Sequence, residues 1–185
     1  MTKEALKDLI IYLLSKAGEM SKVKLAKLIL FADILHFNRI GDSITGMYYI
    51  RLKNGPVVAF FDEVLEQHEG TLWDIVTKEI PIYSEGVMKK QYLYTARTKK
   101  EPSKEVQQTI EQVIKKYGKK TGTELSNESH SLPAWKYSEP NEPIFIAELA
   151  ARDEKEYFSL VDLTEDTEDN DSDLAKKIPS PLPPG

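Results

Sequence analysis

The sequence has no cysteine, only three histidines and no long apolar run. The absence of cysteine excludes disulfide bonds, thiol catalysis, iron–sulfur ligation and zinc sites built on cysteine. The longest apolar stretches, LIIYLL and LILFADIL, fall far short of the roughly 20 residues that a membrane-spanning helix needs. No secretory signal pattern opens the chain. We therefore expect a soluble protein with no membrane contact, located in a reducing cytoplasm.

An excess of positive charge is also missing. From Asp162 onward, seven acidic residues outnumber two lysines, so this end carries the whole net charge of −5 and residues 1–161 are neutral. A neutral body is poorly suited to neutralising phosphates, and direct nucleic-acid binding is not expected. The length and the 41% hydrophobic content suit a single core. We predict one domain over residues 1–161 and a disordered, acidic, proline-rich tail over residues 162–185.

Hydrophobic periodicity predicts several helices. Helical patterns cover residues 6–17, a second helix capped by Ser21, and residues 60–68, 103–118, 123–132 and 147–158. Thr121 and Glu124 have the spacing of a capping box, and Pro133 is expected to stop the helix that they begin. The first two helices should form an antiparallel pair.

Between these helices the pattern changes to that of strands. Residues 43–58 are rich in β-branched and aromatic side chains, and residues 80–96 read as a hairpin that turns at residues 84–86. The prediction is therefore an α+β fold: a mainly helical single domain with a small antiparallel β-sheet or hairpin.

Two polar residues interrupt the apolar second helix. Asp33 and His36 lie about 60° apart on one helix face, close enough for their side chains to meet. They suit a general base oriented by a carboxylate, or a metal pair completed by His130 or His68. The alternative is a partly buried polar pair that satisfies backbone groups of the following turn, residues 41–46. No metal site or cofactor is predicted.

A second pair, Ser126 and His130, has the i, i+4 spacing that lets side chains touch on a helix. The strand-turn-helix elbow and the Gly-x-Ser-x-Gly motif of a serine nucleophile are absent. The segment KNGPV has one glycine and no following Gly-Lys-Ser/Thr, so it is no phosphate loop. Catalysis is not predicted.

Aromatic residues concentrate on the predicted strands, where alternation sends half of each strand outward. In the strand predicted over residues 46–52, Ile50 is the most apolar residue and Arg51 the most costly to bury. We therefore expect Tyr48 and Ile50 to face inward, and Tyr49 and Arg51 outward. With Gly55, Pro56 and Trp135, the outward pair forms a candidate protein-binding surface, because tyrosine, tryptophan and arginine dominate such surfaces.

Three blocks of the sequence carry a family resemblance: KLAKLILFADILHF, GDSITGMYYIRLKNGPV and LSNESHSLPAW. Together they resemble the Panacea domain of SocA-like antitoxins, a family often called phage-associated proteins. The matching positions are Lys27, Leu28, Phe31, Ala32, Asp33, His36, Gly41, Ile44, Thr45, Gly46, Tyr49, Gly55, Pro56, Val57, Leu125, Ser126, Ser129, His130 and Trp135. Ile29 and Leu30 depart from the usual pattern, and the acidic tail is not part of the domain.

The resemblance implies an antitoxin that neutralises a neighbouring protein toxin by direct binding, with no enzymatic activity. In at least one branch of the family, the protein is a proteolytic adaptor that delivers its toxin to a AAA+ protease. On this reading, Asp33 and His36 hold the helix end against residues 44–46, with His130 as a further candidate partner, so that the aromatic strand presents a fixed surface. A hydrolase that uses Asp33, His36 and His130 is the third hypothesis.

Overall fold

A computed structural model describes residues 3–67, 74–84 and 86–162 of the chain. Its helices and strands follow in the order α1 (Lys3–Ala17), β1 (Met20–Ser21), α2 (Lys22–Ile40), β2 (Tyr49–Ile50), β3 (Val57–Val58), α3 (Phe61–Gln67), β4 (Ile75–Ser84), β5 (Val87–Ala96), α4 (Lys104–Tyr117), α5 (Gly122–Ser129), α6 (Pro133–Tyr137), β6 (Pro143–Ile144) and α7 (Ile146–Leu149). Residues 154–162 are also helical.

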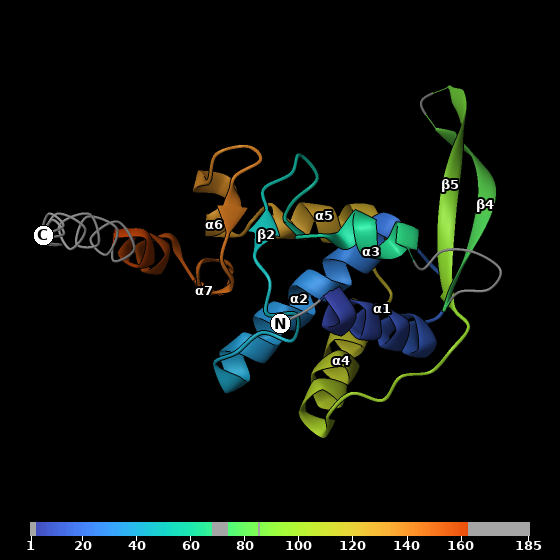
Figure 1. Ribbon diagram of the computed structural model, residues 1–185. Coiled ribbons are helices and arrows are strands. Elements are labelled where there is room, and N and C mark those ends of the chain that lie inside the picture. Colours follow the sequence, from blue (N-terminus) through green and yellow to red (C-terminus); the bar gives the residue numbers. More distant parts are fainter. Residues whose placement is uncertain (1–2, 68–73, 85, 163–185) are drawn as a thin grey trace, which may run out of the picture.

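Helix α2 runs through the centre of the helical body, between α1 and α4 on one side and α5 on the other (Figure 1). All nine residues from 25 to 33 are buried, because neighbours cover every side of the helix. A helix that is apolar all round belongs in a core. Polar side chains on this stretch therefore have no solvent to reach, and each must find its partner inside the protein.

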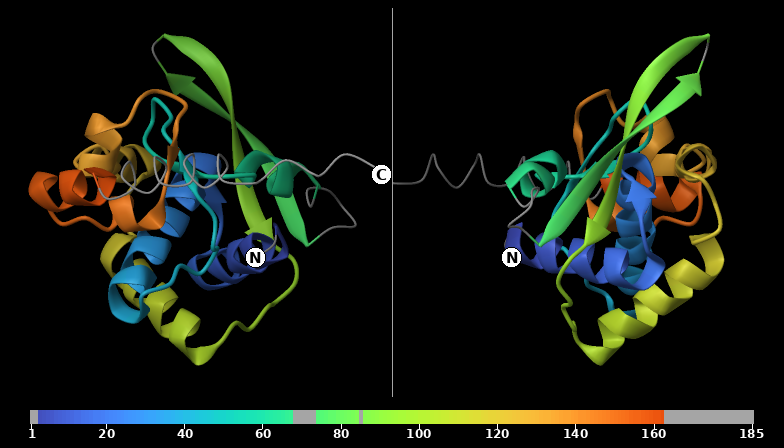
Figure 2. Two further views of the ribbon diagram at one scale, coloured as in Figure 1. Left: turned by 60° about the vertical axis from the view of Figure 1, so that its left-hand side comes forward. Right: turned by 90° about the vertical axis from the view of Figure 1, so that its right-hand side faces the viewer.

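Two small antiparallel sheets accompany the helices. One has the strand order β1-β5-β4, and the other has the order β3-β2-β6. Strands β4 and β5 form a ten-residue hairpin, with Ile75 opposite Ala96 at its base and Ser84 opposite Val87 at its tip. The hairpin projects from the helical body as a twisted arm (Figure 2). The predicted α+β fold, mainly helical with small antiparallel sheets, is confirmed.

Local sequence signals located the helix ends well. Ser21 caps α2 by accepting a hydrogen bond from the backbone N–H of Lys24, and Ser103 caps α4 in the same way. The capping box of Thr121 and Glu124 is present at the start of α5. These caps were predicted because they depend only on residues within one turn.

Three predicted boundaries were wrong. Residues 147–158 do not form one helix, because the chain leaves the helical conformation at residues 151–153. Helix α5 ends at Ser129, before Pro133, and Pro133 instead begins α6, where its missing N–H costs nothing. The strand predicted over residues 46–52 is reduced to Tyr49–Ile50.

The predicted faces of this strand are also wrong for its two tyrosines. Tyr49 is fully buried, whereas Tyr48 is 39% exposed. The hydroxyl of Tyr49 donates a hydrogen bond of 2.7 Å to Asp33, which draws the ring into the core. Arg51 is half-buried, and the two-residue strand ends before it, so alternation cannot relate its direction to that of Tyr49. Tyr49 is thus no part of the exposed surface.

Candidate partner-binding site

Asp33 on α2 holds the turn that follows this helix. Its carboxylate is fully buried and accepts hydrogen bonds from the backbone N–H groups of Ile44 and Thr45, at 2.9 and 3.1 Å. The hydroxyls of Thr45 and Tyr49 donate to its second oxygen. Burial raises the pKa of Asp33, while these hydrogen bonds lower it. Asp33 therefore contacts the turn at Ile44 and Thr45, within the 44–46 segment against which it was predicted to lie.

His36 has a different partner from the one predicted. Its Nδ1 atom lies 3.0 Å from the hydroxyl of Thr109 on α4, so His36 connects two helices and not the helix end to the turn. The Thr109 hydroxyl donates to the carbonyl of Glu105, and it can therefore accept from the Nδ1–H of His36. Burial lowers the pKa of His36, which favours the neutral ring.

The segment from Arg51 to Val57 forms a tight turn held by side chains of three helices. Each of these side chains binds a main-chain carbonyl. Lys27 of α2 donates to Pro56 O at 2.7 Å, Trp135 of α6 donates to Leu52 O at 2.9 Å, and Ser126 of α5 donates to Asn54 O. The side chains of these helices therefore fix the path of the turn, and Leu52, Lys53 and Asn54 remain exposed on it.

Gly55 makes this close approach possible. It is buried and has φ of +93°, a conformation that L side chains rarely adopt. A Cβ atom at this position would lie 2.1 Å from the Ser129 hydroxyl and 2.8 Å from Nζ of Lys27. Gly55 and Pro56 are both buried, so they shape the turn and offer little surface of their own.

A stack of three side chains supports the other side of the turn. The rings of His130 and Trp135 stack with centroids 3.9 Å apart, and the Arg51 guanidinium lies 4.6 Å from the Trp135 ring centre. Arg51 Nε also donates to Trp135 O at 3.2 Å. Burial and the nearby cations Lys27 and Arg51 lower the pKa of His130. The stack gives Arg51 and Trp135 a shared position beside the turn.

The arrangement gives no support to the hydrolase or metal hypotheses. Ser126 directs its hydroxyl to Asn54 O and not to His130, so the two do not form a nucleophile–base pair. Asp33, His36 and His130 engage three separate sets of partners. In the part of the chain that the structure describes, no group of three or more His, Asp or Glu residues could hold a metal ion. His68 lies outside the described residues.

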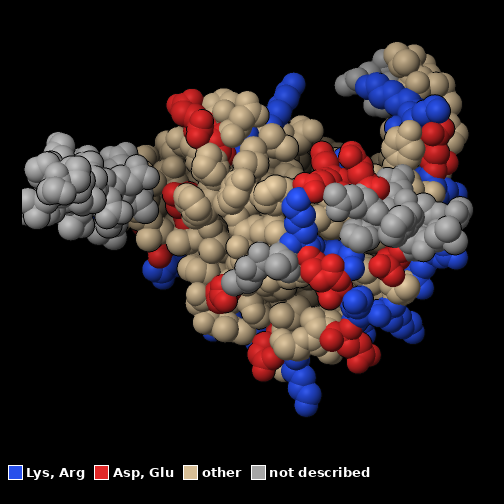
Figure 3. All heavy atoms as spheres, in the orientation of Figure 1, with Lys and Arg blue, Asp and Glu red and all other residues tan. Residues whose placement is uncertain are grey.

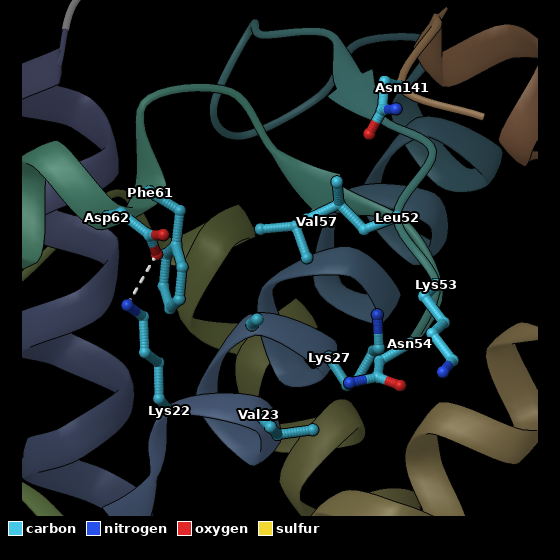
Figure 4. Close-up of a pocket in the computed structure, with 11 residues that line it drawn as sticks. Lys22, Val23, Lys27, Leu52, Lys53, Asn54, Val57, Phe61, Asp62 and Asn141 are labelled. Atoms are coloured by element: carbon cyan, nitrogen blue, oxygen red, sulfur yellow. Dashed lines mark ion pairs between the residues drawn. The ribbon is translucent and has the colours of Figure 1, made fainter. Parts of the chain in front are cut away.

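Beside the turn lies an open groove made of two adjoining hollows. The larger, of about 450 Å³, and the smaller, of about 200 Å³, share Leu52, Val57, Phe61 and Asp62 in their walls. Lys27 and Asn54 lie side by side at one end of the larger hollow, and an ion pair of 2.9 Å between Lys22 and Asp62 closes the other end (Figure 4). We call these two hollows the groove.

The surface around β2 and the adjoining part of α2 is largely uncharged, with acidic and basic side chains gathered at its edges (Figure 3). Leu52 and Phe60, both lining the groove, are exposed by 37% and 45%. Phe60 also has φ of +61°, an uncommon conformation for a residue with a large side chain. Backbone conformations of this kind cluster at functional sites.

The blocks that meet at this turn are far apart in the sequence, and a family comparison covers them all. The family model described as "Antitoxin SocA-like, Panacea domain" matches residues 25–136, more than half of the chain. The chain belongs to this antitoxin family. No curated protein and no solved structure matched the chain in two further comparisons.

The match to the Panacea domain runs from α2 to α6 and so includes the Asp33 turn, the 51–57 turn and the groove. Helix α1 lies outside the matched range, yet it packs against α2 and its residues from Leu9 to Leu14 are buried. No helix among the described residues has the length and apolar character to cross a membrane.

The structure brings together most of the residues that the sequence singled out. Arg51, Gly55, Pro56 and Trp135 meet at the 51–57 turn, where Ser126 and His130 support them. Tyr49 and Asp33 lie in the core behind the turn, and His36 lies further along α2.

Sequence analysis missed Lys27 as a site residue. It is only 1% exposed, and among the described residues Pro56 O is its one hydrogen-bond acceptor. Burial without a neighbouring carboxylate lowers its pKa to about 7. The signal was available: Lys27 sits within a stretch of α2 that is apolar on every side, where a lysine cannot reach solvent.

Proposed function

We propose that this Panacea-domain protein neutralises a cognate protein toxin in the cytoplasm by binding it directly, through the groove and the exposed residues of the 51–57 turn. The observation that carries the proposal is that three residues of the family motif together fix the path of one exposed turn. Lys27, Ser126 and Trp135 all bind carbonyls of one turn and hold its outer residues in place. A rigid, partly apolar surface of this kind suits protein recognition, because little ordering entropy is lost on binding.

The groove offers the apolar contacts that such an interface needs. Leu52 and Phe60 expose their side chains, and Val57 and Phe61 line the floor between them. Apolar anchors seated in a pocket contribute most of the binding energy at protein interfaces. Arg51 and Trp135 contribute at the edge of this surface, and Gly55 and Pro56 fix its shape. Bound there, the antitoxin covers part of the toxin surface and prevents its action.

A growth-rescue assay with a matched control tests the proposal. The product of the adjacent reading frame is expressed as the toxin, and growth is measured with and without this protein. We expect the wild type to restore growth, and Leu52→Ser and Phe60→Asn to fail. The control is Val87→Ser at the hairpin tip, a similarly exposed apolar residue far from the groove, which should restore growth fully.

Calorimetry with the purified toxin gives the magnitude. Each groove substitution should weaken binding by about 2 kcal/mol, or roughly 30-fold, while circular dichroism remains that of the wild type. Asparagine tolerates the left-handed backbone of position 60 better than phenylalanine, so this variant should fold. A one-to-one complex supports direct neutralisation. Rescue that needs an active AAA+ protease and removes the toxin from the cell would contradict it.

A further inference from the structure

Lys27 is a buried lysine, and none of the described residues supplies a counterion for its ammonium form. Its ammonium group has three donors, and in the described part of the chain only one of them is used, on Pro56 O. Burial is the sole cause of its pKa shift, so no described carboxylate lies near enough to compensate its charge. Buried charges are normally paired, because removing an ammonium from water costs several kcal/mol or more. An unpaired one beside a hollow is therefore unusual.

The hollow next to Lys27 has the chemistry to supply that partner. Among its described lining residues, Lys22 is already paired with Asp62, while Lys27 and Lys53 form no ion pair with any residue that the structure describes. The Asn54 amide lies beside Lys27 at the same end of the hollow (Figure 4). Val57, Leu52 and Phe61 make the wall between the two ends apolar. The hollow is thus positive and polar at one end and apolar along its length.

We infer that this hollow receives the carboxylate of an Asp or Glu side chain from the partner protein, bound by Lys27 and Asn54, with an adjoining apolar side chain of the partner against Val57 and Leu52. The inference rests on the proposed function and specifies the chemistry of the partner. The ion pair would form in a partly desolvated place, where charge-assisted hydrogen bonds are strong. A single carboxylate would then compensate the one buried ammonium.

The lining favours a carboxylate over a phosphate group. Phosphate sites are typically built from arginines, glycine-rich loops or free N–H groups at a helix start. No arginine lines the hollow among the described residues, and Ser21 already accepts from Lys24 N at the start of α2. With a largely apolar wall, the hollow suits a singly charged group attached to an apolar segment.

Nuclear magnetic resonance titration of the full chain tests this assignment with a pair of blocked tripeptides. The probes are acetyl-Leu-Glu-Leu-amide and its isosteric partner acetyl-Leu-Gln-Leu-amide, which differ only in the charge. We expect the Glu peptide to bind wild-type protein about tenfold more tightly than the Gln peptide. A hydrogen bond to a charged group strengthens binding by about this factor relative to a hydrogen bond between neutral groups. The backbone resonances of Asn54 and Val57 should shift most.

Two variants and a matched control assign the preference to Lys27. Lys27→Met should bind both peptides equally. Asn54→Ala, whose side chain is exposed, should bind the Glu peptide more weakly than the wild type but still prefer it to the Gln peptide, because the Lys27 ammonium remains. The control is Lys24→Met: Lys24 lies on the same helix and also donates to a carbonyl, Gly118 O at 2.7 Å, but does not line the hollow. This control should keep the tenfold preference.

Three results would overturn the inference: equal binding of the two peptides by the wild type, a full Glu preference in Lys27→Met or undiminished Glu binding in Asn54→Ala, or sodium acetate or sodium phosphate binding as tightly as the Glu peptide. The proposed function fails separately. A protein that neutralises the toxin but does not discriminate between the peptides overturns the inference alone. A protein that discriminates between them but binds no toxin overturns the proposed function alone.

Discussion

Helix α2 carries two buried ionisable residues that each hold a turn, and the two differ in how many of their hydrogen-bonding sites are used. Asp33 is fully buried and accepts four hydrogen bonds from Ile44, Thr45 and Tyr49. Lys27 lies almost two helical turns earlier, is 1% exposed and donates one hydrogen bond, to Pro56 O. The Asp33 carboxylate is thus saturated with hydrogen bonds, whereas the Lys27 ammonium has donors that remain unused among the described residues.

The difference separates a structural residue from one that is available for binding. A saturated carboxylate such as Asp33 gains nothing from a ligand. An ammonium with unused donors beside a hollow is left with a cost that a ligand can offset. Burial alone does not distinguish these roles; the number of satisfied donors and acceptors does.

The largest effect should follow from removing Asp33. Asp33→Ala leaves two backbone N–H groups and two hydroxyls without their acceptor in the core, and we expect a loss of about 4 kcal/mol in the free energy of unfolding. Asp42→Ala is the control, because this exposed carboxylate accepts a hydrogen bond from no described donor but Ser43 N, and its loss should cost about 0.5 kcal/mol. Urea denaturation measures both. A loss below about 1 kcal/mol for Asp33→Ala would remove the contrast.

Lys27 should make stability depend on pH. Its pKa is about 7 in the folded protein and 10.5 when unfolded, so between these values the unfolded chain binds the additional proton. Stability should therefore rise with pH, by about 1 kcal/mol per unit and about 3 kcal/mol between pH 7 and 10. The same measurement on Lys27→Met, subtracted from that on the wild type at each pH, gives the part of this pH dependence that is due to Lys27. If the wild type and Lys27→Met differ in free energy of unfolding by the same amount across that range, the charge of Lys27 is compensated in the folded protein.

The two turns should also differ in how they tolerate a methyl group. Gly55 and Gly41 both have positive φ, but a Cβ atom at Gly41 meets nothing within 4 Å, whereas one at Gly55 collides with Ser129 and Lys27. We expect Gly55→Ala to cost about 2 kcal/mol more than Gly41→Ala in thermal unfolding. Equal losses would mean that the 51–57 turn can move away from α2.

The smallest effect concerns one of the four bonds to Asp33. Tyr49→Phe keeps the buried ring and removes the hydroxyl donor, and it should cost about 1.5 kcal/mol. Tyr12→Phe is the matched control, because the buried Tyr12 hydroxyl has no hydrogen-bond partner among the described residues. That variant should be neutral or more stable. If both variants change the free energy of unfolding by the same amount, the hydrogen bond from Tyr49 to Asp33 does not contribute to stability.

The sequence predicted what depends on nearby residues. The caps at Ser21, Ser103 and Thr121 need only one turn of helix, and the hairpin over residues 80–96 shows in its alternation and its turn. Residues 163–185, which include most of the predicted tail, lie outside the described part of the chain, and the boundary at residue 161 stays a prediction.

The candidate site was predicted less well, because it depends on contacts between distant segments. The orientation of Tyr49 is set by Asp33, sixteen residues away, and a two-residue strand gives too little alternation to reveal it. The role of Lys27 depends on the crossing of α2 with a turn 29 residues later. Composition and spacing could identify these residues as unusual but could not show which of them meet.

The side chains that hold the 51–57 turn grip main-chain carbonyls, at Leu52, Asn54 and Pro56. A carbonyl is present whatever residue occupies the position. The exposed side chains at positions 52–54 can therefore be exchanged in the course of evolution without disturbing the path of the loop. The anchors at Lys27, Ser126 and Trp135 and the glycine at position 55 are not free in this way. Under the proposed function, such a division would let recognition diversify at three positions while the scaffold is inherited unchanged.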